Sequence, residues 1–187
     1  MLAAEDINIQ AILCGSSTMQ HIIFSDRTIE ALIAFSWHRC CTKPNLEIAN
    51  HAVMVAKASA IEKYIASAEW CLGRTYFLLS EFQPAYDHLQ EAYQVFNALP
   101  PGDHELQRDC CECGNHLIVV ARIVLDTDKA VSLARDVETK SAALLDDVVH
   151  AQSLLSLGAS LNKAEERQEA LHHLDRAMTM SKAVGSI

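Results

Sequence analysis

Helix-breaking residues are scarce in this sequence, which has only 6 glycines and 4 prolines among 187 residues. This scarcity argues against an all-β domain, because that architecture needs many tight turns. Aromatic residues are also few, at 6%, although half of all residues are hydrophobic. The apolar mass therefore consists mainly of alanine, leucine, valine and isoleucine, which suit closely packed helices. The composition predicts long, regular helices.

Basic residues are outnumbered, with 15 lysines and arginines against 24 aspartates and glutamates and a net charge of −9. Nucleic acids and anionic membrane surfaces attract clustered lysine and arginine, and the sequence has no such cluster. The most apolar run, Leu117–Leu125, is interrupted by Arg122 and is too short to span a bilayer. We therefore expect neither a nucleic acid nor a membrane as a partner.

The start of the chain also lacks the positive charge of a secretory signal, because MLAAEDINIQ carries acidic residues there. The seven cysteines are odd in number and have no regular spacing. Without a signal for export, such cysteines are not expected to form disulfides. These features predict a protein of the reducing cytoplasm.

Apolar residues recur at spacings of three and four along almost the whole chain, as amphipathic helices require. The length allows one domain with a sizeable core. We therefore expect residues 1–187 to form a single all-α domain. The predicted helices lie near residues 2–13, 26–41, 45–58, 60–79, 85–98, 104–124, 129–136, 139–161 and 168–183.

Every second predicted helix carries an alanine followed at helical spacing by further aliphatic or small residues. The four runs are Ala49-Val53-Ala56, Ala85-Leu89-Ala92, Ala130-Ala134-Val137 and Ala170-Leu174-Ala177. A glycine precedes two of the leading alanines by 12 residues, at Gly73 and Gly158. Small residues at these positions let two helices approach closely, so the pattern predicts paired, repeated helices.

These landmarks resemble the tetratricopeptide repeat, a helix-turn-helix unit whose signature includes W-x2-L-G-x2-Y and A-x3-F. The resemblance is clearest at residues 60–98 and 139–183 and weaker at 26–58 and 104–137, where Trp37 and Ile118 occupy the glycine position. It implies a right-handed α-solenoid of about four repeats, in a variant with a longer period that is found in signalling proteins. Gly114, one turn before the expected position, should then tolerate alanine far better than Gly73 tolerates leucine. The alternative is a helical bundle without repeats.

The stretch DCCECGNH, Asp109 to His116, places cysteines and a histidine three residues apart on one helix face. Zinc prefers four such ligands, and a metal site here would need Cys71, Cys110, Cys113 and His116 to converge. Free cysteine also behaves as a small buried hydrophobic residue. We favour this second interpretation and expect no cofactor.

No phosphate-binding loop, HExxH or GxSxG motif occurs, so we do not expect an enzyme. The resemblance instead implies a scaffold that binds a protein or peptide in a concave groove lined by the first helix of each repeat. Two alternatives stay open. One is a structural or regulatory segment of a larger repeat array, which would self-associate through apolar surface exposed at its ends, and the other is a metal- or thiol-dependent sensor.

The groove positions implied by the resemblance are Trp70, Arg74, Phe77, Asn115, Arg122 and His38. Tryptophan and arginine are common in binding hot spots, and an aromatic anchor beside two arginines predicts a partner of acidic and apolar character. The alternative is that Trp70 is buried between the second and third repeats.

Overall fold

The computed structural model describes residues 25–185, which form eight α-helices and no β-strand. The helix predicted near residues 2–13 lies outside this described range. The helices are α2 (Asp26–Thr42), α3 (Leu46–Ser59), α4 (Glu62–Leu78), α5 (Phe82–Ala98), α6 (His104–Val124), α7 (Thr127–Ala142), α8 (Asp147–Lys163) and α9 (Arg167–Val184). None of these helices is both long enough and apolar enough to cross a membrane.

Four helices begin at a residue whose side chain caps the free backbone N–H groups of the first turn. These capping residues are Ser25, Asn45, Asp103 and Asp146. The turns between helices repeat as well. Residues 60 and 145, which precede α4 and α8, both have φ of 55°, and residues 80 and 165, within the following pairs, both have φ of 64°. Residues 60 and 145 are 85 positions apart, as are residues 80 and 165 and the glycines Gly73 and Gly158. The helix pairs α4–α5 and α8–α9 therefore have equivalent geometry.

The boundary predicted between residues 136 and 139 is wrong. Helix α7 continues to Ala142, because the segment around the fully buried Val137 contains no helix breaker. The chain turns instead at Leu145, whose φ is positive, and Asp146 then accepts hydrogen bonds from the N–H groups of Val148 and Val149. The last turn of α7 therefore consists of residues assigned from the sequence to the following helix.

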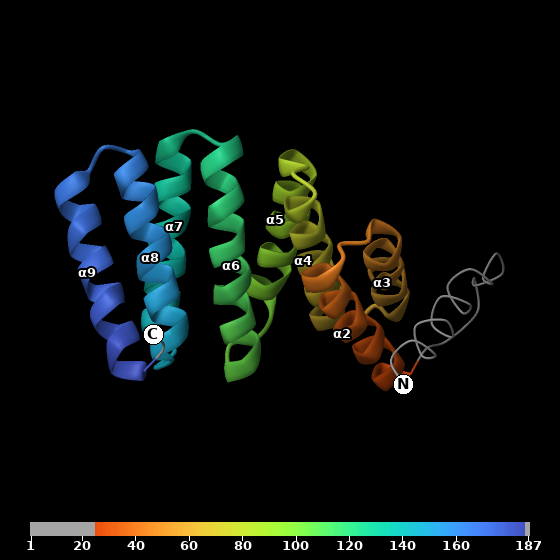
Figure 1. Cartoon of the computed structure of the whole chain (residues 1–187). Helices are drawn as coiled ribbons and strands as arrows, with labels where there is room; N and C mark the ends of the chain where they lie inside the picture. The colour runs from red at the N-terminus through yellow and green to blue at the C-terminus, as the bar shows by residue number, and fades with distance from the viewer. Residues whose placement is uncertain (1–24, 186–187) are drawn as a thin grey trace.

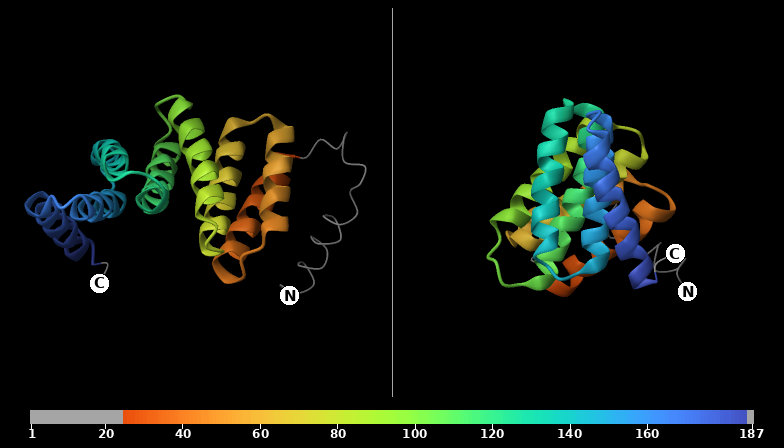
Figure 2. Two further views of the ribbon diagram at one scale, coloured as in Figure 1. Left: turned by 90° about the horizontal axis from the view of Figure 1, so that it is seen from above. Right: turned by 90° about the vertical axis from the view of Figure 1, so that its left-hand side faces the viewer.

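The helices form an α-solenoid of four antiparallel pairs (Figure 1). Its first helices contact one another in order, α2 with α4, α4 with α6 and α6 with α8, and the second helices α3, α5, α7 and α9 pack against their outer side. Figure 2 shows this elongated stack from above and from one end. The expectation of an all-α repeat solenoid is confirmed, and one face of the molecule is formed mainly by first helices.

Glycine allows the closest approach within two of these pairs. A Cβ atom on Gly73 would lie 2.7 Å from Leu89 Cγ, and one on Gly158 would lie 2.7 Å from Leu174 Cγ. Gly114 is also tightly enclosed, with Val137 Cγ2 at 2.7 Å from the position of its Cβ. In the third pair the close contact therefore lies at Gly114, one turn before the fully buried Ile118, so alanine at position 114 should cost some stability, although less than leucine at position 73.

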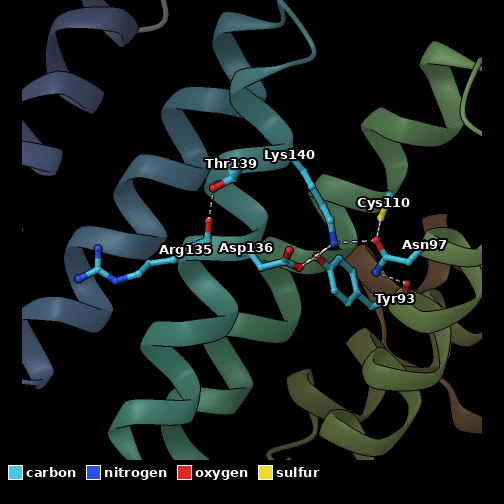
Figure 3. A network of polar contacts seen from close by, with 7 residues as sticks. All are labelled: Tyr93, Asn97, Cys110, Arg135, Asp136, Thr139 and Lys140. Atoms are coloured by element: carbon cyan, nitrogen blue, oxygen red, sulfur yellow. Dashed lines mark hydrogen bonds and ion pairs between the residues drawn. The ribbon is translucent and has the colours of Figure 1, made fainter.

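A network of polar side chains joins the second pair to the third (Figure 3). Lys140 Nζ donates to Asp136 Oδ2 at 2.6 Å, Asn97 Oδ1 at 2.8 Å and Tyr93 Oη at 3.0 Å. Tyr93 Oη donates to Asp136 at 2.8 Å, and Cys110 Sγ donates to Asn97 at 3.5 Å. Burial and the Asp136 carboxylate raise the pKa of Tyr93, so its hydroxyl stays a donor. The network connects α5, α6 and α7 and so fixes the third helix pair against the second.

Apolar side chains remain exposed on the last two helices, as the sequence predicts for the end of the array. Leu155 on α8 is 56% exposed, and Leu171 and Met178 on α9 are 61% and 50% exposed. Together with Val148 and Val184, these side chains form what we call the α8–α9 apolar surface.

Candidate functional site

A pocket of about 430 Å³ opens among the first helices, beside the middle of α2 and the first turns of α4 and α6. This volume is within the range of ligand-binding pockets. Its apolar wall consists of Ile33, Trp37, Tyr64, Trp70 and Leu106. Helices α2 and α4 pack directly on each other, whereas α4 and α6 touch less extensively, so the space between their first turns stays open.

The polar part of this pocket, which we call the α2–α4–α6 pocket, is mainly acidic. One lysine, Lys63, is the only basic residue in its wall among the described residues, and its Nζ lies 4.7 Å from the centroid of the Tyr64 ring. The carboxylates in the wall belong to Glu30, Asp103, Glu105 and Asp109.

Trp70 lines the pocket but is mostly part of the core. Its side chain is 7% exposed and packs edge-on against Trp37 and Phe96, with ring centroids 4.8 Å and 6.1 Å away. Its Nε1–H donates to Nδ1 of His116, on α6, at 2.9 Å. The observed geometry is therefore the alternative in which Trp70 is buried between the second and third pairs, with only an edge toward the pocket.

Arg74 lies beside this cluster and has partners of its own. One of its terminal nitrogens, Nη1, is 2.9 Å from His116 Nε2, and its guanidinium carbon is 5.4 Å from the centroid of the Trp37 ring. A neutral imidazole accepts at only one nitrogen, so it cannot accept from Trp70 and Arg74 at the same time. The guanidinium of Arg74 therefore also lies against the face of Trp37, and no carboxylate among residues 25–185 forms an ion pair with it.

The other predicted groove residues lie apart from the pocket. Phe77 is half-buried against Phe82, at a centroid distance of 6.1 Å. Asn115 is buried and donates to Ser153 Oγ at 3.1 Å, which ties α6 to α8. Arg122 is partly buried and its backbone carbonyl accepts from Lys163, while His38 is exposed near the end of α2. The structure thus brings Trp70 and Arg74 together and leaves the remaining four predicted residues separate.

The four candidate metal ligands do not form a common site. Cys71 Sγ is 3.2 Å from Ser36 Oγ, while Cys110 donates to Asn97 and Cys113 to the carbonyl of Leu89 at 3.8 Å. The fourth candidate, His116, has both ring nitrogens directed toward Trp70 and Arg74. Burial raises the pKa of Cys110 to about 11, which keeps it a thiol. In residues 25–185 these side chains therefore serve packing and local hydrogen bonds.

We expect His116 to stay neutral well below the pH at which exposed histidines become charged. Burial, and to a lesser extent the positive charge of Arg74, lower its pKa to about 4. Its charged form would lose the hydrogen bond from Trp70 and repel Arg74. NMR titration of the ring carbon signals should show little change at His116 between pH 7 and 5, with most of the change below pH 5. A midpoint near 6.5, the ordinary value, would contradict the buried position.

One group in the described residues could hold a metal ion, and none of its residues is among the four candidate ligands considered from the sequence. Glu69, His88 and Glu91 offer ligand atoms within 4.8 Å of one another. Lys57 already provides a positive charge there, with its Nζ 2.6 Å from Glu69 Oε1 and 3.1 Å from Glu91 Oε1. His88 Nδ1 lies 2.7 Å from the other carboxylate oxygen of Glu69, and the His88 ring stacks on the ring of Tyr76. This arrangement is complete as an ion-pair network that joins α3, α4 and α5.

We expect Glu69→Gln to lower the free energy of unfolding by about 1–3 kcal/mol, because the fully buried carboxylate bonds both Lys57 and His88. Burial alone would raise the pKa of Glu69, but these two hydrogen bonds outweigh it and lower the pKa below 4.5. The contribution should therefore be complete above pH 4.5 and disappear as the pH falls through the lowered pKa. Urea unfolding of both proteins at pH 7 and pH 3 measures this, and an equal difference at both values would contradict it.

Sequence reasoning missed most of the pocket wall, including Tyr64, Leu106 and Asp109. Helix α6 has 21 residues and begins well before the first position of the repeat pattern. The groove residues expected on α6, Asn115 and Arg122, therefore lie beyond its first turns, which face the pocket. The signal that was available is the pair Leu106 and Asp109, which are three residues apart and so share a helix face.

No protein-family model matches this sequence, and no curated protein matches it either. Solved structures do match its fold. BtubC (BKLC) from P. vanneervenii is similar with a TM-score of 0.72 and 19% identity, over 99% of this chain and 74% of BtubC. Two structures of the nearly identical TPR-like repeats of a putative kinesin light chain from Podosopora anserina are also similar. Their TM-scores are 0.72 and 0.69, each at 14% identity, over 97% and 95% of this chain and 85% and 84% of theirs. This chain therefore has the fold of tetratricopeptide-like repeat proteins.

Proposed function

We propose that this protein is an interaction scaffold that binds a protein or peptide partner on the face formed by its first helices. The observation that supports this most directly is the α2–α4–α6 pocket, an open cavity of about 430 Å³ with an aromatic wall on that face. Repeat solenoids of this kind generally serve protein–protein interaction, because stacked helices present an extended surface to a partner. The pocket is the point on that surface where a side chain of the partner can be enclosed.

The expected groove residues are revised accordingly. Trp70 remains in the proposed site as part of the pocket wall, and Trp37 and Tyr64 join it. Arg74 is not part of the wall but contacts the Trp37 ring through a cation–π interaction. Phe77, Asn115, Arg122 and His38 lie apart from this pocket, and we no longer assign a role in this contact to them.

Site-specific photocrosslinking tests the location. Ala34 on α2 is exposed and lines the pocket, whereas Gln94 is exposed on the second helix α5. We expect a benzoylphenylalanine residue at position 34 to give discrete adducts with a cellular protein and the same residue at position 94 to give none. Adducts at 94 alone, or at neither position, would contradict binding on the first-helix face.

A second candidate function is that of a segment within a longer array or a self-associating unit. The α8–α9 apolar surface favours it, because Leu155, Leu171 and Met178 are all at least half exposed. A cavity of about 420 Å³ lies on the same surface. Light scattering across concentrations tests this candidate. We expect self-association that is reduced in the double variant Leu155→Glu/Met178→Glu, and a monomer at all concentrations would contradict it.

Two further assignments remain proposals. We propose that the protein is not an enzyme, because binding, rather than catalysis, is the general use of this fold. We also propose the cytoplasm as its location, on the basis of its acidic composition and its free cysteines. A fluorescent fusion observed in cells tests the location directly.

A further inference from the structure

Asp109 stands out among the acidic residues of the α2–α4–α6 pocket. Glu30 accepts a hydrogen bond from Tyr64 Oη at 2.7 Å, and Asp103 caps the first turn of α6. Glu105 is exposed to solvent. Asp109 is partly buried, yet within residues 25–185 its side chain makes neither a hydrogen bond nor an ion pair. A carboxylate in this situation has lost part of its hydration without any compensating contact.

The surroundings of Asp109 increase this cost. Burial is the main cause that raises its pKa to about 6, and the carboxylates of Glu112 and Glu105 raise it further. Arg108 acts in the opposite direction, but it is paired with Glu112 at 3.1 Å and Asp146 at 3.3 Å. The charged groups that face this region are Asp103, Glu105, Arg108 and Glu112 from α6, Glu30 from α2 and Lys63 from α4.

We propose that the α2–α4–α6 pocket receives a lysine or arginine side chain of an extended partner segment, with Asp109 as its ion-pair partner and an adjacent apolar residue of the segment against Trp37 and Leu106. The proposal rests on the function proposed above and names the chemistry of the partner. A cation at this position compensates the carboxylate that the free protein leaves unpaired. Its apolar stem fits the aromatic wall, because long basic side chains bury their methylene groups and interact with tryptophan faces.

Charge favours this partner over the acidic one expected from the sequence. That expectation depended on Arg74 and Arg122. The first is held between His116 and Trp37, and the second is partly buried elsewhere on α6. Four carboxylates and one lysine line the pocket, and the whole chain carries a net charge of −9. Both the local and the overall field therefore attract a basic segment and repel an acidic one.

The experiment uses the full chain, immobilised, and a library of random 12-residue peptides displayed on phage. We expect the selected peptides to be enriched in lysine or arginine next to a leucine or an aromatic residue. A synthetic copy of the strongest binder should lose affinity at least tenfold when its basic residue is replaced by norleucine. Enrichment of acidic peptides would overturn the inference while it leaves the proposed function in place.

Asp109→Asn is the decisive variant, and Asp175→Asn, an exposed aspartate on α9, is the matched control. We expect the first to weaken binding of the selected peptide at least tenfold and the second to leave it unchanged. The melting temperature of Asp109→Asn should equal or exceed that of the parent protein, because an unpaired charge is removed. Unchanged affinity in Asp109→Asn would overturn the inference. Failure to select any peptide, together with the absence of crosslinks at position 34, would contradict the proposed function as well.

Discussion

Replacing Trp70 by alanine is expected to lower the free energy of unfolding by about 3–5 kcal/mol, the range for deletion of a large buried aromatic side chain. The side chain is 7% exposed and fills the space between Trp37 and Phe96. Its loss also leaves His116 without the donor at Nδ1. Urea unfolding followed by circular dichroism measures the change. An exposed hot-spot residue would behave differently, because its replacement would abolish binding without affecting the helices.

The control for Trp70→Ala is Trp70→Phe, which keeps most of the ring volume but removes the N–H donor. We expect a smaller loss, about 1–2 kcal/mol, which corresponds to one hydrogen bond and a partial cavity. A cost below 1 kcal/mol for Trp70→Ala would show that the side chain is not part of the core. It would also restore Trp70 as an exposed anchor for a partner.

Leucine at position 73 is expected to destabilise the protein by about 3 kcal/mol, at the upper end of what overpacking usually costs. The first added atom would lie 2.7 Å from Leu89 Cγ, 3.0 Å from the backbone nitrogen of Leu89 and 3.1 Å from the carbonyl oxygen of Ala85. Backbone atoms of α5 cannot move away without separating the two helices. Thermal unfolding of Gly73→Leu measures the effect, with Ala58→Leu at an exposed position of α3 as the control.

Gly114→Ala should also destabilise the protein, but less, by about 1 kcal/mol. Its new methyl group would meet side-chain atoms, Val137 Cγ2 at 2.7 Å and Tyr93 Cε2 at 2.9 Å. These can shift by rotation or small displacements, although the hydrogen bond from Tyr93 to Asp136 limits that movement. If Gly114→Ala had no effect, the tight contact of α6 with α5 and α7 would be contradicted.

Of the six groove residues predicted from the sequence, only Trp70 lines the pocket, because spacing within one helix does not show which side chains face a neighbouring helix. Trp70 and Arg74 were identified from their spacing to Gly73, and His116 was identified for a different reason, as a possible metal ligand. Their mutual contact could not be predicted, because it joins residues more than 40 positions apart. The acidic character of the pocket was missed for a similar reason, since Glu30 and Asp109 belong to different helices that converge only in the folded chain.

The sequence by itself determined that this protein is a solenoid of paired helices. Apolar spacing, scarce helix breakers and the small residues at 73, 85, 158 and 170 are local properties, and each constrains only one helix or one helix pair. Only the tertiary structure decided which side chains became core and which lined a pocket. The burial of Trp70 depends on Trp37, Phe96 and His116, which belong to three other helices. The side chain of Asp109 is unpaired because no basic side chain from another helix forms an ion pair with it in residues 25–185. Such relations arise from the packing of several helices together, and no spacing within one helix encodes them.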